Sequence, residues 1–410
     1  MVTASLILAG LIASVLVSLF LSRFVCASFA PSVTTSSRYG AIDGLRGLLA
    51  LSVVAHHFAI WLQVTRGNSL WVAPDVAILN QLGAGAVGLF FMITGLLFYP
   101  KITSGIGNVS WVRVYVGRVF RILPMVVLSI VIVMSITGAR TGRLLSAADL
   151  PALVQWVTAV GEPGLLGDAD AGRTNAYVLW SLWYEWMFYI LLLPILSLAM
   201  DVVRGRLPSW TVPAALLVLT LGSRLVVHEE GFFYYAPLFA VGMLAAEISG
   251  VPAAARALKS RTASIGALLA LVVGTMLFHR PTGFALPLFA VFFVSVACGN
   301  DCFGLLTTRS AALLGEISFG VYLVHGCVLS LFFVEGASFV DGWSDMQMAL
   351  MLPLLATATT VIAYFTYRSV ERPSIDLGRV AVAKMTWEQE AKRVLGGYGT
   401  SRRATASAPD

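Results

Sequence analysis

An arginine and a histidine share one apolar stretch of the chain, residues 41–64. Arg46 and His57 are eleven residues apart, which is about three helical turns. Both side chains therefore fall on one helix face, about 16 Å apart along the axis, while His56 points about 100° away. An imidazole exchanges protons near neutral pH, and a guanidinium binds anions such as phosphate. Because ionisable groups inside a membrane helix are costly and usually face a cavity, the pair predicts a functional face.

A carboxylate and a second histidine are expected at the same depth. Ser181, Glu185 and Tyr189 are spaced by four residues and therefore share a helix face. Counting from the expected helix ends places Glu185, His57 and His325 about 16 to 20 Å from the same membrane surface. An unpaired carboxylate at that depth takes up a proton or needs a cationic partner. We therefore expect Glu185 to pair with one of the two histidines in a shared cavity.

Each of these residues also has a structural interpretation. A membrane histidine can simply hydrogen-bond to a neighbouring helix, which is worth roughly 0.6 kcal/mol. The aromatic residues around Glu185, in the stretch WSLWYEWMFY, are typical of the belt at a membrane surface. The agreement in depth between three helices favours a functional cavity.

A second group of charges is expected at the cytosolic membrane surface. Arg118 and Arg121 are three residues apart and share a helix face, and Arg46 is expected at the same level. Guanidinium groups bind phosphate in bidentate geometry, so these three arginines could form a phosphate clamp. Attraction to anionic lipid is the alternative, and it is sufficient for Lys101 and Arg113.

Several familiar site motifs are missing from the sequence. No G-K-[ST] follows the glycines, and neither G-x-S-x-G nor H-E-x-x-H occurs. Gly83, Gly85, Gly88 and Gly95 are instead expected to allow close helix packing beside the helix of Arg46.

The four cysteines, Cys26, Cys298, Cys302 and Cys327, lie in or beside apolar segments. Cys298 and Cys302 are four residues apart and could share a helix face, which leaves a metal site as a minor alternative. Packing as small apolar side chains is the favoured interpretation, and we expect no metal.

The composition that surrounds these residues is that of an integral membrane protein. Hydrophobic residues make up 58% of the 410-residue chain and charged residues 12%, against roughly 25% charged in an average soluble domain. We expect an all-α fold, a polytopic transmembrane helical bundle of about ten helices with a possible extra N-terminal helix. The apolar windows are 45–64, 84–100, 122–138, 177–198, 210–228, 232–249, 262–279, 284–300, 312–334 and 346–367, with 6–21 as the possible extra helix. A short helix is expected at 147–160 within the longest polar connection.

Basic loops set the expected orientation. Most of the 27 lysines and arginines fall on one side of the bundle, which the positive-inside rule assigns to the cytosol together with the C-terminus. This accounts for the net charge of +6 without a nucleic-acid partner. Residues 6–21 are a spanning helix or a signal peptide, with the helix favoured because no charge precedes them. The expected domains are an N-terminal apolar helix and linker at 1–39, a membrane domain at 40–375 and a cytosolic, partly disordered tail at 376–410.

Six stretches of the chain resemble, in order, motifs of the acyltransferase 3 family of polytopic membrane acyltransferases. They are AIDGLRGLLALSVVAHHF, GAVGLFFMITG, RVFRILP, WSLWYEWMFY, ISFGVYLVHG and VERP. The resemblance covers about residues 40–375 and implies transfer of an acyl group, often acetyl, from cytosolic acyl-CoA to a hydroxyl of a glycan, lipid-linked sugar or other glycoside. The expected departures from the family pattern are the extra apolar N-terminal run and the absence of the C-terminal extracytoplasmic hydrolase-like domain that some members carry.

The resemblance also implies roles for seven residues. The implied catalytic residues are His57, Glu185, Tyr322 and His325. The implied acyl-CoA-binding residues are Arg46, Arg118 and Arg121. The expected partners are acyl-CoA, a carbohydrate or glycoside acceptor and the lipid bilayer, with no permanently bound cofactor. The expected location is the cell membrane, multi-pass, as in a bacterial inner membrane.

These residues suggest a mechanism and leave rivals open. The arginines would hold the phosphates of coenzyme A, and His57 would deprotonate the acceptor hydroxyl while Glu185 or Tyr322 orients it. Direct attack is favoured over a covalent acyl-histidine because no second nucleophile is evident. A proton-coupled transporter or flippase is the main alternative, although no inverted repeat is visible. A purely structural scaffold would leave the deep carboxylate unexplained.

Overall fold

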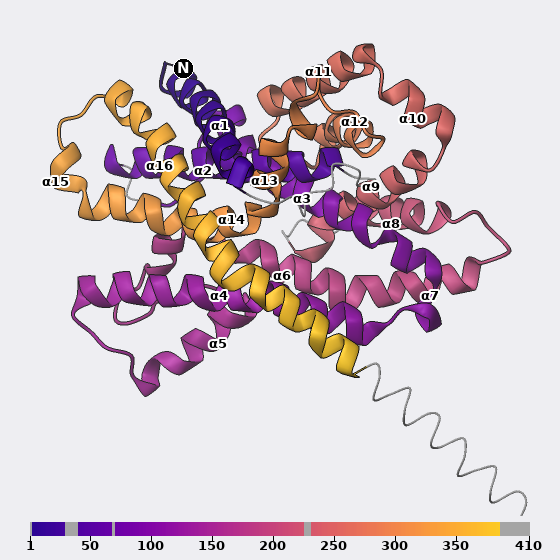
Figure 1. The fold of residues 1–410 in the computed structure, drawn as a ribbon, viewed down its shortest axis with the longest axis horizontal. Coiled ribbons are helices and arrows are strands. Elements are labelled where there is room, and N and C mark those ends of the chain that lie inside the picture. The colour runs from indigo at the N-terminus through magenta and orange to yellow at the C-terminus, as the bar shows by residue number, and fades with distance from the viewer. Residues whose placement is uncertain (1, 29–39, 68–69, 225–230, 386–410) are drawn as a thin grey trace, which may run out of the picture.

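The computed structural model of the chain is an all-α bundle, which confirms the predicted fold class (Figure 1). It describes residues 2–28, 40–67, 70–224 and 231–385. The helices are α1 (Val2–Ser28), α2 (Gly40–Thr65), α3 (Ala77–Ser104), α4 (Trp111–Thr141), α5 (Leu150–Thr158), α6 (Trp180–Met187), α7 (Leu193–Val203), α8 (Thr211–Ser223), α9 (Phe232–Ser249), α10 (Pro252–Leu258), α11 (Arg261–Leu277), α12 (Leu286–Ala297), α13 (Arg309–Glu316), α14 (Ser318–Ser330), α15 (Ala337–Val340) and α16 (Asp345–Thr366).

Eight helical segments among the described residues are long and apolar enough to cross a membrane. A ninth candidate is the pair α10 and α11, which is bent by 74° at its break, and α8 and α12 are shorter apolar helices. Every apolar window found in the sequence corresponds to one of these segments. The protein is therefore a multi-pass membrane protein whose helices follow the hydropathy pattern closely.

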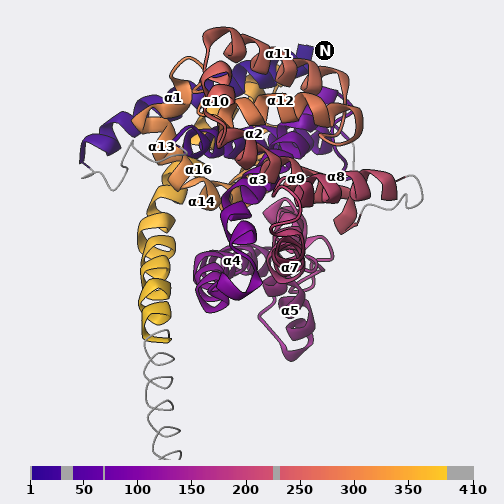
Figure 2. The same ribbon diagram turned by 90° about the vertical axis from the view of Figure 1, so that its right-hand side faces the viewer.

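Helices α2 and α3 form the interior of the bundle. In each, 72% of the most apolar window is buried inside the protein. Figure 2 shows α4, α5 and α7 on one side of this pair and α1 with α10 to α13 on the other. The candidate site lies where α2, α3 and α14 meet α4 and α6.

Glycines let α3 approach two neighbours at the level of the site. A side chain on Gly95 would collide with the backbone of Phe239 in α9, and one on Gly242 would collide with the backbone of Met92 in α3. Gly83 faces the ring of His56 in α2 in the same way. The predicted close packing against α2 is thus confirmed for Gly83, whereas Gly95 packs against α9 and Gly85 and Gly88 face Phe289 and Pro281.

Three helices near the site contain a π-helical turn, and two of these turns precede a proline. Pro194 cannot donate a backbone hydrogen bond, and the turn before it widens into a π-helix, η4 (Phe188–Leu192). The same happens ahead of Pro373, where η8 (Tyr367–Glu371) follows α16. A third π-helix, η7 (Leu331–Glu335), ends α14 without a proline.

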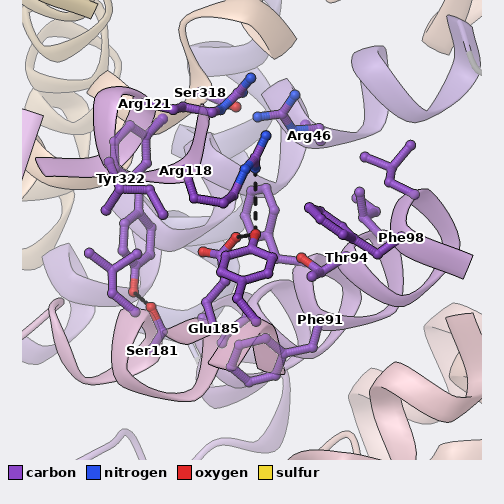
Figure 3. Close-up of a pocket in the computed structure, with 18 of the residues that line it drawn as sticks. Arg46, Phe91, Thr94, Phe98, Arg118, Arg121, Ser181, Glu185, Ser318 and Tyr322 are labelled. Atoms are coloured by element: carbon purple, nitrogen blue, oxygen red, sulfur yellow. Dashed lines mark hydrogen bonds between the residues drawn. The ribbon is translucent and has the colours of Figure 1, made fainter. Parts of the chain in front are cut away.

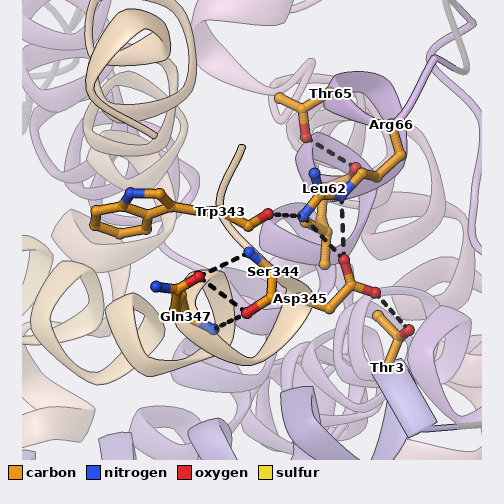
Figure 4. A network of polar contacts seen from close by, with 8 residues as sticks. All are labelled: Thr3, Leu62, Thr65, Arg66, Trp343, Ser344, Asp345 and Gln347. Carbon is orange, nitrogen blue, oxygen red and sulfur yellow. Dashed lines mark hydrogen bonds and ion pairs between the residues drawn. The ribbon is translucent and has the colours of Figure 1, made fainter. Parts of the chain in front are cut away.

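A polar network joins the first helix to the last (Figure 4). Thr3 donates a hydrogen bond to Asp345 at 2.8 Å, and Arg66 forms an ion pair with the same carboxylate at 3.1 Å. Arg66 also donates to the carbonyl of Trp343. The start of α1, the end of α2 and the start of α16 therefore lie at the same end of the bundle, and α1 packs against α16 and α13.

The predicted short helix and tail can be compared with the structure. The connection after α4 contains a 3-10 turn, η2 (Ala147–Asp149), and α5, so the helix expected at 147–160 is confirmed. Helical structure continues from α16 through Met385, so the predicted tail at 376–410 begins as a helix. Its remainder, and the linker at 29–39, lie outside the described residues.

Candidate functional site

A cavity of about 270 Å³ opens between α2, α3, α4, α6 and α14 (Figure 3). It has charged groups at one end and hydroxyl groups at the other. The residues that line it include Arg46, Lys101, Arg118, Arg121, Ser181, Glu185, Tyr189, Ser318 and Tyr322, together with apolar side chains of α3. Five of the seven sequence-predicted site residues are therefore in one cavity.

The cationic end of the cavity is formed by the three predicted arginines, Arg46, Arg118 and Arg121. The Arg118 guanidinium lies over the rings of Phe98 and Tyr189, at 5.3 and 5.6 Å from their centroids. These rings hold the guanidinium by cation–π attraction. The site can accept a large anion because three guanidinium groups converge on one opening.

Lys101 is a fourth cation in this cavity. From the sequence, attraction to anionic lipid was a sufficient explanation for Lys101 and Arg113. Arg113 is exposed and does not line the cavity, whereas the Lys101 ammonium lies 4.8 Å from the Phe98 ring centroid inside it. Lys101 therefore belongs with the arginines at the cationic end of the cavity, a position that the sequence did not predict for it.

Glu185 is bound within its own helical segment. The Tyr189 hydroxyl, one turn further on, donates a hydrogen bond to the Glu185 carboxylate, and Arg118 donates to the same hydroxyl at 3.5 Å. We expected a histidine as the partner of Glu185, and that expectation was wrong. Tyrosine four residues along the helix is the hydrogen-bond partner of the carboxylate, and the cation near it is Arg118 of α4 rather than a histidine.

Two hydroxyl groups close the inner end of the cavity. The hydroxyls of Ser181 and Tyr322 are 2.8 Å apart, and Tyr322 donates to the carbonyl of Val178 at 2.8 Å. Because the Tyr322 proton is committed to that carbonyl, Ser181 is the donor in the shared hydrogen bond. Both side chains are at least nine-tenths buried, so they form a compact polar partition.

The two predicted histidines meet beyond this partition. His57 Nδ1 and His325 Nε2 are 2.9 Å apart, and the ring of His325 lies 6.0 Å from that of Tyr322. Among the described residues that bound the cavity, neither histidine is found. The expectation of one shared cavity was thus wrong: the cavity ends at Tyr322, and the histidine pair with its aromatic neighbours, called the histidine compartment below, lies on the other side of that residue.

Hydrogen bonds fix the tautomers of both imidazoles. A carbonyl oxygen can only accept, so His325 Nδ1, at 3.1 Å from the Val321 carbonyl, carries the proton. His325 Nε2 is then a lone pair that accepts from His57 Nδ1, which also lies 3.2 Å from the Val53 carbonyl. His57 Nε2 is left unprotonated and has no hydrogen-bond partner in the described part of the chain. The arrangement presents one basic nitrogen.

Aromatic residues surround the half-buried ring of His57. Trp71 lies nearly parallel to it, with centroids 6.3 Å apart, and Tyr177 meets Trp71 edge-on at 5.9 Å. Tyr177 and its neighbour Ala176 have positive φ angles of 50° and 55°, a strained conformation for residues other than glycine. This end of the bundle is opposite to the arginines.

His56 has a structural role. Its Nδ1 donates to the Leu79 carbonyl at 2.8 Å, and its ring is buried against Gly83. The helical geometry that separated it from His57 in the sequence is confirmed.

Glu162 is a residue that sequence analysis missed. Its carboxyl accepts hydrogen bonds from the backbone N–H of Leu179 at 2.8 Å and from Asn175 at 3.3 Å. Ser129 of α4 donates to Asn175 from the other side. Burial raises the pKa of Glu162 to about 8. Glu162 therefore holds the strained segment 175–179, whose Val178 carbonyl binds Tyr322.

Glu371 was quoted within VERP but given no role. Its side chain is 1% exposed, and neither carboxylate oxygen has a hydrogen-bond partner among the residues that the structure describes. Its main charged neighbours are Arg121 and Arg46. A buried carboxyl group without hydrogen bonds is costly, and this one lies next to the arginines at the cationic end of the cavity.

No group of histidine, cysteine or acidic side chains in the described ranges could hold a metal ion. Cys298, Cys302 and Cys327 are buried and free, and Cys26 lies where side chains are not described.

The family model described as an acyltransferase domain, that of the acyltransferase 3 family, matches residues 39–368. No curated protein and no solved structure matches the chain with significant similarity. Because the matched region is most of the chain, the protein belongs to this family and is a membrane acyltransferase.

Proposed function

We propose that this member of the acyltransferase 3 family transfers an acyl group, acetyl in the simplest case, from acyl-CoA to a hydroxyl of a carbohydrate or glycoside. The main support is the cavity in which Arg46, Arg118 and Arg121 converge at one end and the hydroxyls of Ser181 and Tyr322 close the other. Guanidinium groups suit the phosphates of coenzyme A. The apolar walls between the two ends suit its pantetheine arm.

The proposal gives each side of the bundle a substrate. The arginine end faces the cytosol, where acyl-CoA is made and where basic residues gather by the positive-inside rule. The opposite end, with Trp71 and Tyr177 above His57, faces the exterior and receives the acceptor. The enzyme then modifies a cell-surface or exported glycan from within a bacterial inner membrane.

The chemistry needs one base and one place for negative charge. His57 Nε2 takes the proton of the acceptor hydroxyl, whose oxygen attacks the thioester carbonyl carbon. The carbonyl oxygen becomes an oxyanion, and the hydroxyls of Tyr322 and Ser181 donate hydrogen bonds to it. The C–S bond then breaks, and the coenzyme A thiolate takes the proton back from His57. His325 fixes the orientation of His57, because its Nε2 accepts a hydrogen bond from His57 Nδ1.

One movement is necessary for this reaction. Tyr322 stands between the cavity and the histidine pair, with its hydroxyl held by Val178 and Ser181. The thioester reaches His57 only when that hydroxyl leaves the Val178 carbonyl. The Tyr322 hydroxyl then donates to the oxyanion in place of the Val178 carbonyl, so it has a hydrogen-bond acceptor both before and after the movement.

Labelled substrate tests the proposal directly. Purified protein in nanodiscs is incubated with acetyl-CoA labelled in the acetyl group and with a crude glycan fraction. Label in an alkali-labile ester of the glycan is the expected result. The same partition would also serve a proton-coupled carrier, so uptake of an unmodified solute into proteoliposomes without any transfer of label would favour that second candidate and contradict the first.

A further inference from the structure

The inner end of the cavity has an apolar floor. Val87, Phe91 and Leu182 line it, and their side chains are 6%, 3% and 4% exposed. Figure 3 shows Phe91 and Ser181 at the end of the cavity away from the guanidinium groups. Apart from the hydroxyls of Ser181 and Tyr322, this end therefore offers only hydrocarbon surface.

Phe91 is held in place by a second layer of rings. Its centroid lies 4.9 Å from that of Phe239, 5.6 Å from that of Tyr235 and 6.2 Å from that of Tyr184. The backbone of α3 cannot retreat either, because Gly95 brings it against α9 one turn further along. A close-packed interior of this kind yields little to an added methylene group.

The position of the floor relative to the hydroxyls has a consequence for the donor, and this step rests on the proposed function. If the arginines hold the phosphates and the Ser181 and Tyr322 hydroxyls hold the thioester carbonyl, the acyl carbons beyond the carbonyl point toward Phe91. The whole cavity has a volume of about 270 Å³, most of which the pantetheine arm must fill.

We propose that Phe91 sets the acyl-chain length of the donor. Acetyl and propionyl groups fit between the hydroxyl pair and the Phe91 ring, whereas chains of six carbons or more collide with it. Phe91 is a specificity-determining residue in this proposal, and it takes no part in proton transfer.

A binding series tests the proposal without knowledge of the acceptor. Coenzyme A and its acetyl, butyryl and hexanoyl thioesters compete with labelled acetyl-CoA for the full-length protein in nanodiscs. We expect hexanoyl-CoA to bind at least about 10-fold more weakly than acetyl-CoA, since one misplaced methylene already costs about 10-fold or more. In Phe91→Ala the two thioesters should bind equally well, while coenzyme A itself binds as in the parent protein.

Two further variants make the outcome decisive. Phe98→Ala lies at the cationic end and should weaken every ligand of the series by the same factor. Val87→Phe narrows the floor and should weaken acetyl-CoA while leaving coenzyme A unchanged, which covers the case in which Phe91→Ala fails to fold. An identical chain-length order in the parent protein, Phe91→Ala and Val87→Phe would overturn the role of Phe91. Failure of the parent protein to bind any member of the series would instead overturn acyl-CoA as the donor, and the chain-length limit with it.

Discussion

The cavity and the histidine compartment, which lie on either side of Tyr322, contain different kinds of side chain. The cavity contains charged, long side chains with aromatic rings beneath them, such as Arg118 over Phe98 and Tyr189. The histidine compartment contains neutral rings whose protons are fixed by backbone carbonyls. Charge suits binding of a soluble anion, and a fixed neutral imidazole suits proton transfer. On the proposed function, affinity and reactivity lie at different depths of the bundle, with Arg46 and His57 at different levels of the same helix α2, so variants should separate them.

Removal of His57 should have the largest effect, and it should lower the rate of transfer without changing binding. We expect His57→Ala to lower the transfer rate about 10²- to 10⁴-fold, the range of a general base, while acetyl-CoA binding stays unchanged. Transfer of acetyl label and equilibrium binding are measured on the same preparation. His279→Gln, which changes an exposed histidine elsewhere, is the matched control. Unchanged turnover in His57→Ala would remove His57 from the role of base.

Loss of the Tyr322 hydroxyl should affect the partition itself. Tyr322→Phe keeps the ring and removes the hydrogen bonds to Ser181 and Val178. A missing oxyanion donor costs about 10²-fold in turnover, so we expect roughly that loss with little change in acetyl-CoA affinity. Tyr99→Phe, whose hydroxyl binds Glu247 outside the cavity, should retain full activity. A large loss of affinity with normal turnover would assign Tyr322 to the binding compartment instead.

Truncation of Arg118 should act on the other compartment. Hydrogen bonds to charged groups contribute about 1.5 to 3 kcal/mol each, so Arg118→Ala should weaken acetyl-CoA binding about 10- to 100-fold. Turnover at saturating donor should change much less, because His57 is untouched. Arg113→Ala removes an exposed arginine of the same helix and should change neither quantity. Equal losses of acetyl-CoA affinity in Arg113→Ala and Arg118→Ala would show that the effect comes from general surface charge and not from the cavity.

Glu162 should produce the smallest effect, one on stability that depends on pH. Its pKa is raised by burial from 4.5 to about 8, so the native state binds the proton more tightly than the unfolded state does. The free energy of unfolding should therefore fall as pH rises between these values, by at most about 1.4 kcal/mol per pH unit. Thermal unfolding in detergent from pH 5 to 8.5 measures this slope. Glu162→Gln should flatten it, and an equal slope in both proteins would contradict the assignment.

The sequence predicted how deep each residue lies along its helix. It did not predict which neighbouring helix each side chain faces. Depth counting placed His57 and His325 at one level, and they are in contact. The same counting placed Glu185 beside them, but it gives no information on which way each helix turns. Glu185 faces α4 and takes Tyr189 as partner. Spacing alone had already put those two residues on one face.

Residues in irregular segments and at helix ends were hardest to find from sequence. Glu162 lies in a connection without periodicity, where a carboxylate is ordinarily solvated, and only the fold shows its contact with Leu179. Lys101 had a sufficient explanation as a lipid anchor, so nothing in its neighbourhood called for another. Glu371 stood in a motif quoted for resemblance, and its burial without hydrogen bonds is a property that no local pattern encodes.

The polar network at the ends of α1, α2 and α16 bears on how the chain is assembled during synthesis. Thr3 and Asp345 are separated by 342 residues, so the ribosome has inserted nearly every other span before this contact can form. Helix α1 must wait in lipid for its principal neighbour α16, and its docking is a late, high-contact-order step. Truncation of the chain before Asp345 would leave α1 without that neighbour.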